Sequence, residues 1–392
     1  MIQRSKYSTR FFMVAGEPSG DMHGAALIRA LRERRPDIQV YGLGGPEMRN
    51  EGAETLYDVK DMAVMGFFNV LLRYPFFRRA FRRLLQDVRA RRPDVAVLID
   101  YPDFNLRLAD RLHRLNIKTV YYICPQVWAW RRGRVKQMAR ILDRLLAIFP
   151  FEPDCFKDTS LPVDFVGHPL VDEVQRFLQQ PQQPLPWAGS PRIALLPGSR
   201  MGEIRHILPV MWQAAGRLQK ERPDASFLVA AASPEIESVI RSRTAGWPNG
   251  PARVDVVVGR TRAALRQADA AMTASGTATL ETALLDCPMI VVYKMPAPTH
   301  FLARRLVQTE HIGMVNIVAG RRVCPEFVQN EATPEALAQA VAGLIEDTPR
   351  RAEMLAGLEQ VRNALGPGGA AHRAAERILG VIDGRPEKEA MP

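Results

Sequence analysis

The sequence VAGEPSGD at residues 14–21 places a glycine-bearing turn directly after the apolar run at residues 11–14. The same arrangement returns twice in the second half of the chain, as LLPGSR at 195–200 and as ASGTATLE at 274–281. A short apolar strand followed by Gly, Ser or Thr and then a helix presents free backbone N–H groups and the positive end of a helix dipole, which suit a phosphate. We therefore expect anion sites in both halves, on the two walls of a cleft.

Strand and helix patterns alternate along the whole chain. In the first half the apolar run at 95–99 follows an amphipathic stretch at 76–91, and in the second half the runs at 192–196 and 289–293 continue the pattern. Short apolar runs between helices of this length are typical of βαβ units and a parallel sheet. The sequence therefore predicts an α/β protein built from two Rossmann-like, doubly wound domains.

A stretch rich in Pro and Gln marks the boundary between the two halves, because no periodicity survives there. We expect an N-terminal domain over residues 1–178, a linker over 179–191 and a C-terminal domain over 192–365. Residues 366–392 are expected to form a last helix and tail that pack back on the N-terminal domain.

Bulk composition narrows the class of protein. A length of 392 residues fits about two domains. The net charge of +11 leaves nucleic acid, an anionic membrane and phosphorylated small molecules open as partners. The four cysteines stand far apart, which argues against a disulfide scaffold or a zinc site and fits a reducing cytoplasm. No stretch approaches the ~20 apolar residues of a membrane span, so we expect a protein that can lie on a membrane without crossing it.

The two turns of the second half contain neither a Walker loop nor a G-x-G-x-x-G motif. Gly198 and Ser199 followed by Arg200 would suit a diphosphate. Taken alone this motif is better explained as a structural turn with a solvated arginine, but together with the third turn it favours a phosphate site. In the third turn Ser275 or Thr277 would cap a helix, and Gly276 would let the backbone approach a ligand. Glu281, one turn into that helix, would accept ribose hydroxyls or merely compensate the helix dipole.

Two turns of the first half carry candidate catalytic carboxylates. Asp100 ends a fully apolar strand, where a carboxylate faces the crevice of an open α/β sheet and could act as a general base. Asp103 is expected to cap the helix that follows. In the first turn Asp21 occupies a position that suits a helix cap. Glu17 lies inside the tight turn, where a structural role explains it less well, and it joins Asp100 as a catalytic candidate.

The stretch 65–83 interleaves aromatic and apolar residues with arginines and contains no acidic residue. It favours an interfacial segment on anionic lipid, the alternative being an ordinary helix with one core face and one basic face. Its candidates for lipid or acceptor binding are Met65, Phe67, Phe68, Phe77 and Arg78.

A second aromatic and basic stretch, CPQVWAWR at 124–131, follows a predicted strand. Trp128 and Trp130 could stack on a base, anchor at an interface or simply pack. His168 could contact a substrate or be a satisfied histidine, and the sequence leaves both open.

Taken together, the motifs closely resemble those of the lipid-A-disaccharide synthase family from about residue 12 to residue 378. Cys124, where a small residue such as serine is expected, and the first ten residues depart from the pattern. The matching segments are AGEPSGD (15–21), AVMG (63–66), IDYPDFN (99–105), VWAWR (127–131), LPGSR (196–200), SGTA (275–278) and PEFVQ (325–329).

The resemblance implies a GT-B glycosyltransferase whose two Rossmann-like domains face each other across a cleft. Such an enzyme joins UDP-2,3-diacylglucosamine to 2,3-diacylglucosamine 1-phosphate (lipid X), giving a β-1,6-linked disaccharide and UDP, with no metal or other cofactor. It implies UDP contacts at the turns of the second half and a catalytic role for Arg200. It also adds Arg131, Asn316 and Gln329 to the acceptor-binding or lipid-binding candidates, and it implies peripheral attachment to the inner membrane and allows a homodimer.

Two other classes remain as alternatives at this stage. One is a different GT-B enzyme acting on UDP-N-acetylglucosamine, either a 2-epimerase or a lipid-linked sugar transferase. An epimerase has no lipid acceptor and would not need the stretch 65–83. The other is a basic nucleic-acid-binding protein, but the arginines lie on several predicted helices and no nucleic-acid motif is present, so we expect no nucleic-acid partner.

Overall fold

The computed structural model describes residues 8–62, 74–130, 132–296, 299–300, 309–346 and 348–384. The chain divides into two compact units. Unit 1 comprises Met1–Pro169 together with Gly368–Pro392, and unit 2 comprises Leu170–Pro367. Helix α8 (Pro169–Leu178) therefore begins unit 2, although the sequence pattern placed residues up to 178 in the first domain. Its Glu173 pairs with Arg262, which belongs to the same unit.

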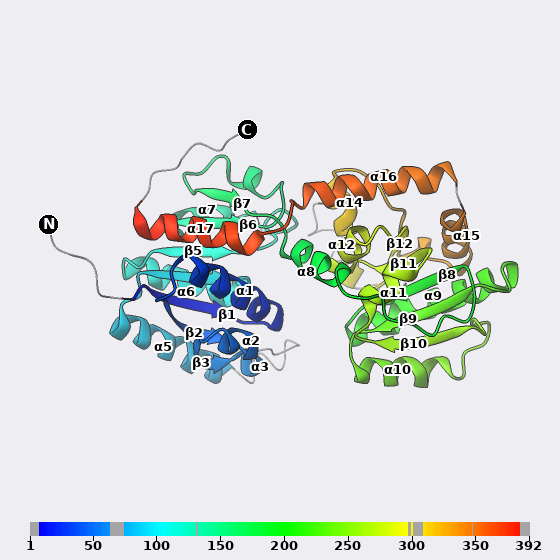
Figure 1. The fold of residues 1–392 in the computed structure, drawn as a ribbon, viewed down its shortest axis with the longest axis horizontal. Helices are drawn as coiled ribbons and strands as arrows, with labels where there is room; N and C mark the ends of the chain where they lie inside the picture. Colours follow the sequence, from blue (N-terminus) through cyan, green and yellow to red (C-terminus); the bar gives the residue numbers. More distant parts are fainter. Residues whose placement is uncertain are drawn as a thin grey trace. The chain divides into compact units, whose positions relative to one another are not determined.

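Unit 1 is built on one parallel sheet with the strand order β3-β2-β1-β4-β5-β6-β7 (Figure 1). The middle strands are buried along nearly their whole length, which is why they appear as continuous apolar runs in the sequence. The order reverses between β1 and β4, so the loops after these two strands border the crevice in which open α/β sheets bind ligands. The strands are β1 (Arg10–Ala15), β2 (Gln39–Gly44), β3 (Glu54–Asp58), β4 (Val95–Ile99), β5 (Thr119–Tyr122), β6 (Arg144–Ala147) and β7 (Val163–Phe165).

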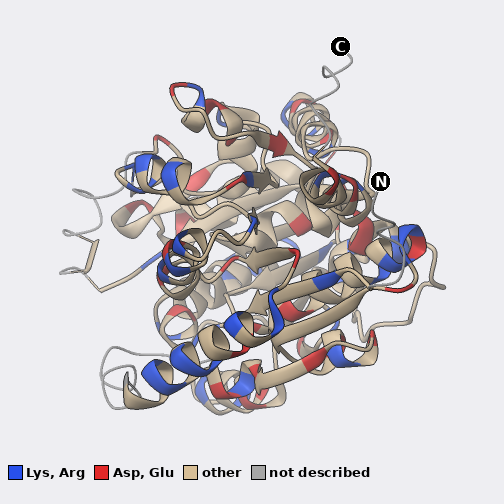
Figure 2. Ribbon diagram, turned by 90° about the vertical axis from the view of Figure 1, so that its left-hand side faces the viewer, with Lys and Arg blue, Asp and Glu red and all other residues tan. Residues whose placement is uncertain are grey.

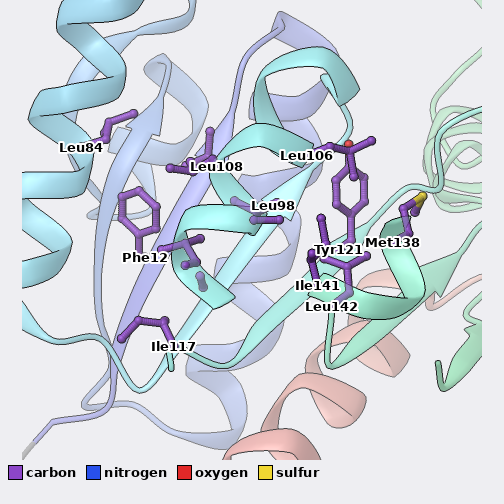
Figure 3. Packing of buried hydrophobic residues seen from close by; sticks show 14 of the residues in the cluster. Phe12, Leu84, Leu98, Leu106, Leu108, Ile117, Tyr121, Met138, Ile141 and Leu142 are labelled. Atoms are coloured by element: carbon purple, nitrogen blue, oxygen red, sulfur yellow. The ribbon is translucent and has the colours of Figure 1, made fainter. Parts of the chain in front are cut away.

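One face of this sheet packs on α5, α6 and α7, and the apolar side chains between them form the core of unit 1 (Figure 3). Phe12 and Leu98 come from the sheet, Leu84 from α5 and Leu108 from α6. The last helix, α17, packs against α1 (Figure 1). The helices of unit 1 are α1 (Pro18–Arg34), α2 (Pro46–Asn50), α3 (Val59–Met62), α5 (Tyr74–Arg91), α6 (Pro102–Arg114), α7 (Arg134–Ile141), the 3-10 turn η1 (Pro153–Phe156) and α17 (Ala370–Asp383).

Unit 2 repeats the plan with the strand order β10-β9-β8-β11-β12-β13, again all parallel. Here the order reverses between β8 and β11, the two strands that carry the second and third glycine turns. The strands are β8 (Arg192–Leu196), β9 (Ser226–Ala231), β10 (Val254–Val258), β11 (Ala270–Ala274), β12 (Met289–Tyr293) and β13 (Glu326–Val328). Besides α8, the helices are α9 (Met201–Glu221), α10 (Pro234–Thr244), α11 (Thr261–Gln267), α12 (Thr277–Leu284), α14 (Met314–Ala319), η2 (Gln329–Glu331), α15 (Pro334–Ile345) and α16 (Pro349–Ala364).

The predicted fold class is confirmed, since both sheets are parallel and flanked by helices. Helix α1 begins at Pro18, directly after the first glycine turn, because proline is favoured in the first turn of a helix. The short outer strands β3, β7 and β13 were not predicted, since three to five half-buried residues carry little periodicity.

Candidate functional site

The switch point of unit 1 brings Glu17 and Asp100 to the ends of the adjacent strands β1 and β4. The sequence predicted only that each residue follows a strand. Glu17 is exposed and stands at the N-terminus of α1. The ring of Tyr101 lies so close to Gly16 that a Cβ on Gly16 would come within 2.2 Å of it. Only glycine at position 16 therefore allows the two loops to approach in this way.

The backbone at Asp100 is held in an uncommon conformation. Asp100 and Tyr101 both have positive φ angles, 47° and 50°. The Tyr121 hydroxyl donates to the Asp100 carbonyl oxygen at 2.5 Å, and Asn105 Nδ2 donates to the same oxygen at 2.7 Å. Strained residues of this kind persist only where surrounding contacts fix them, and they are frequent at functional sites.

The electrostatics of Asp100 suit a proton acceptor. Burial, and to a smaller extent the nearby Glu17 carboxylate, raise the pKa of its carboxyl from 3.8 to about 6, while a hydrogen bond from the Tyr101 amide opposes the shift. A carboxylate with a pKa near 6 is still ionised at neutral pH, yet it binds a proton more strongly than an ordinary aspartate does.

Two other carboxylates of these turns have structural partners that the sequence did not reveal. Asp21 is buried and accepts the backbone N–H groups of Gly45, Glu47 and Met48, so it caps α2 across the loop rather than its own helix. Asp103 was predicted to cap α6, but the helix already begins at Pro102, with Tyr101 as its N-cap residue. Asp103 lies in the first turn and pairs with Arg134.

A buried carboxylate that sequence reasoning missed lies after β6. Glu152 is 0% exposed, accepts the indole N–H of Trp128 at 3.3 Å and accepts the amides of Ile148 and Phe149 at 3.0 Å each. The available signal was an acidic residue between phenylalanine and proline residues (FPFEP, 149–153) directly after a strand. Burial raises the pKa of Glu152 to about 7, against the effect of these hydrogen bonds.

His168 and Trp130, two residues left open by the sequence, have different surroundings. His168 is buried, and the centroid of its ring lies 5.0 Å from that of the Phe149 ring. Burial and the neighbouring His23 lower its pKa to about 3, so the imidazole is neutral at physiological pH. Trp130, by contrast, is 47% exposed.

In the loop after β8, the first glycine turn of unit 2, backbone amides expected to bind a phosphate instead donate to a carboxylate of the chain. Gly198 has a φ of 109°, and the loop folds over the carboxylate of Glu203. Glu203 accepts the amides of Ser199 at 2.9 Å and Arg200 at 3.2 Å, and it also pairs with the exposed Arg200 guanidinium. The Ser199 amide predicted to meet a diphosphate is thus satisfied within the chain, because a carboxylate three residues into α9 completes a capping box. The Arg200 side chain is what this loop presents to an anion.

The second loop of unit 2 remains open. Gly276, with a φ of 137°, is the N-cap residue of α12, with no side-chain cap and no atom within 4 Å of where a Cβ would stand. Ser275 does not cap the helix, since its hydroxyl donates to the Ile312 carbonyl at 2.6 Å. The amide of Thr277 therefore lies at a helix N-terminus without a capping side chain, in the geometry that suits a phosphate.

Glu281 lies on α12 and is only partly exposed. Its carboxylate accepts from Arg262 Nε at 2.5 Å, and the same guanidinium pairs with Glu173 at 2.6 Å. A ribose contact by Glu281 would have to share the carboxylate with this ion pair.

Asn316 and Gln329 are engaged with the backbone. Asn316 is fully buried and donates to the Cys324 carbonyl and to Glu326, while its oxygen accepts the amides of Val323 and Cys324. Gln329 exchanges two 3.0 Å hydrogen bonds with the backbone of Met295. The predicted direct contact between Asn316 and an acceptor is corrected accordingly, because its amide has no hydrogen-bonding position left and holds the loop before β13 instead.

Helix α5 presents arginines along one side, visible as recurring blue positions in Figure 2. Four of them, together with Tyr57, Pro75 and Gln86, line a groove of about 620 Å³; they are Arg78, Arg79, Arg82 and Arg83. Phe77 is partly buried and packs against the core, so for this residue the core-face alternative applies. Met65, Phe67, Phe68 and Arg131 lie outside the described residues.

The described residues contain neither a membrane-spanning helix nor a metal-binding cluster. No helix among them is long and apolar enough to span a bilayer. Within the same residues, no group of three or more His, Cys, Asp or Glu side chains is placed to hold a metal ion.

Solved structures with the same fold define the class. The chain is similar to a putative UDP-N-acetylglucosamine 2-epimerase from Listeria monocytogenes (TM-score 0.67, 13% identity, 98% of this chain and 100% of the other). It is also similar to CalG4, the calicheamicin glycosyltransferase (TM-score 0.62, 14% identity, 97% and 100%). The two parallel sheets with their flanking helices are those of the GT-B glycosyltransferases.

The family model for lipid-A-disaccharide synthetase matches residues 11–376. The lipid-A-disaccharide synthase of Myxococcus xanthus is 42% identical over 380 residues, covering 95% of this chain and 97% of that protein. The one from Geobacter sulfurreducens is 40% identical over 380 residues, covering 96% and 98%. The chain belongs to the lipid-A-disaccharide synthase family.

Proposed function

We propose that this protein is an inverting glycosyltransferase that joins UDP-2,3-diacylglucosamine to lipid X, giving the β-1,6-linked lipid A disaccharide 1-phosphate and UDP. Family membership over nearly the whole chain supports this activity. Within the structure, the single observation that carries it is Asp100, a carboxylate at the switch point of unit 1 whose pKa is raised to about 6. The UDP-N-acetylglucosamine epimerases share only 13–14% identity, which speaks to the fold and not to activity.

Asp100 is assigned the role of general base. It takes the proton from the acceptor 6-hydroxyl as that oxygen attacks the anomeric carbon and the bond to UDP breaks. An α-linked donor that gives a β-linked product requires one displacement, so one base suffices and no covalent intermediate forms. Glu17 assists by raising the pKa of Asp100, which increases its proton affinity.

Unit 2 is assigned the leaving group. The Arg200 guanidinium would meet the charge that develops on the departing diphosphate, and the amide of Thr277 at the α12 N-terminus would do the same. Gly276 leaves space for the diphosphate to approach the backbone. The chain contains no D-x-D pair, and the mechanism as assigned needs no metal ion.

The stretch 65–83 is assigned to the anionic surface of the inner membrane, on the cytoplasmic side. Support comes from the described part of the stretch, where Arg78, Arg79, Arg82 and Arg83 gather along one groove. Each basic residue near an anionic surface contributes about 1 kcal/mol, which gives reversible, salt-sensitive attachment. A homodimer remains a prediction, to be checked by light scattering.

The proposed activity is tested by measuring UDP release from UDP-2,3-diacylglucosamine with and without lipid X. We expect UDP to appear only when both substrates are present, in step with the disaccharide. Release that is independent of lipid X, or conversion of UDP-N-acetylglucosamine to its 2-epimer, would overturn the assignment.

A further inference from the structure

Glu152 is a carboxylate in a buried position, which is unfavourable for folding unless its charge is compensated. Its side chain is fully buried, and a carboxylate withdrawn from water is tolerated only where hydrogen bonds replace its hydration. It has three such donors: the amides of Ile148 and Phe149 on one oxygen and the Trp128 indole on the other. A well-packed apolar side chain would stabilise the fold at least as well, so packing alone does not account for the carboxylate.

The three donors belong to two different loops. Trp128 follows β5, whereas Ile148 and Phe149 follow β6, and in the sheet β5 lies between β4 and β6. The loop that carries Asp100 follows β4, so all three loops leave the same edge of the sheet side by side. Glu152 thus ties the loop after β5, which lies next to the loop of the proposed base, to the loop after β6.

The loop after β5 is held in a strained backbone conformation. Ile123 has a φ of 70°, which is rare for a β-branched residue and persists only where neighbouring contacts enforce it. The strain at Ile123, at the start of this loop, and the hydrogen bond from Trp128 to the buried Glu152 carboxylate of the next loop are independent signs that the position of Trp128 is fixed. The Trp128 ring is only partly buried and packs edge-on against Phe149 and Phe151, with centroids 6.4 and 5.2 Å away.

We propose that Glu152 is a positioning residue for the acceptor: it fixes the Trp128 indole, whose partly exposed ring forms the wall beside Asp100 against which the acceptor sugar lies. This inference rests on the proposed function. Glu152 itself touches no substrate, because it is fully buried, and it acts through Trp128. Its electrostatic neighbours are consistent with this place, since Asp100 and Glu152 both contribute to raising the pKa of the buried Cys124 thiol, to which burial contributes most.

The experiment is a double-mutant cycle on the full chain with Glu152→Gln, Trp128→Phe and the double variant. Gln can still accept the two amides, but its NH₂ group then faces the indole N–H, so the bond to Trp128 is lost. Trp128→Phe removes the same bond from the other side. KM for lipid X, KM for the UDP-sugar, kcat and Tm are measured for each variant. Asp154→Asn, a change to an exposed carboxylate in the adjacent turn η1, is the matched control.

We expect each single variant to raise KM for lipid X roughly tenfold, with the donor KM nearly unchanged, and the double variant to be no worse than either single one, since both remove one interaction. Asp154→Asn should leave all four quantities unchanged. Multiplicative losses in the double variant, or an unchanged lipid X KM in Glu152→Gln, would overturn the proposal. If Glu152→Gln fails to fold, Trp128→Phe alone decides: an unchanged KM for lipid X refutes the role. A wild-type protein that releases no UDP from these substrates refutes the proposed function instead.

Discussion

The two switch points of this molecule have the same topology and opposite chemistry. In unit 1 the loops after β1 and β4 carry Glu17 and Asp100, and two successive residues with positive φ hold the Asp100 turn. In unit 2 the loops after β8 and β11 carry Arg200 and an open glycine, Gly276. A parallel sheet with reversed strand order supplies a crevice in both units, but the residues that follow the strands decide what that crevice can do.

The comparison suggests a division of labour. In unit 1 the Asp100 carboxyl, with its raised pKa, is suited to accept a proton. In unit 2 a guanidinium and a helix N-terminus without a capping side chain are suited to stabilise negative charge. Glu203 makes the contrast less complete, because it neutralises part of the first loop of unit 2 and leaves Arg200 as the main cationic group there.

The largest effect is expected from Asp100→Asn. The amide cannot accept the acceptor proton, so kcat should fall by roughly 10² to 10⁴, the range typical of a lost general base. Turnover is measured as UDP release at saturating lipid X and donor, with Tm as the check on folding. Asp103→Asn is the control, because Asp103 lies three residues away on α6, is paired with Arg134 and has no catalytic role here. Near-normal kcat in folded Asp100→Asn would break the contrast between the two units.

Arg200→Ala tests the proposed leaving-group site of unit 2. Loss of a group that stabilises developing charge should lower kcat by about 10² to 10³, rather than merely raise the donor KM. Arg205→Ala, which removes an exposed arginine from the same helix, should have little effect. Activity should survive EDTA. Activity that EDTA abolishes and Mg²⁺ restores would contradict the metal-free assignment.

The helices that connect the two halves of each sheet, α5 in unit 1 and α11 in unit 2, also differ in charge. In unit 2 Arg262 of α11 is paired with two carboxylates, whereas in unit 1 the arginines of α5 gather around a groove. Replacing Arg78 and Arg82 together by Gln should weaken binding to anionic liposomes about 30-fold, given about 1 kcal/mol for each charge. The control replaces Arg107 and Arg111, two exposed arginines of α6. Equal losses in both variants would mean that α5 is not a membrane-binding surface.

The sequence predicted those features that depend on local pattern. Strands such as β4 and β8 are buried along nearly their whole length, so their apolar runs and the glycine turns after them were visible directly. That pattern showed that Glu17, Asp100 and Arg200 each follow a strand, whereas their places at the switch points come from the strand order of the two sheets.

The features that the sequence did not reveal depend on contacts between separate segments. Asp21 binds amides of α2, more than 20 residues away, and Glu152 reaches the indole of Trp128, 24 residues away. Glu203 lies close in sequence to the loop that it fills, yet the same residue pattern is compatible with a carboxylate that points to solvent. Which amides are free for a ligand therefore had to come from the structure.

The central claim is that Asp100 is the base and that Glu17 tunes it. The most direct measurement is the pH dependence of kcat/KM for lipid X in the wild type and in Glu17→Gln. Activity of the wild type should fall as the pH drops through about 6, because Asp100 is then protonated and cannot accept another proton. In Glu17→Gln the acid limb should move to lower pH, since removal of the neighbouring negative charge makes Asp100 easier to ionise. An acid limb that is absent, or that stays in place when Glu17 is replaced, would contradict the account.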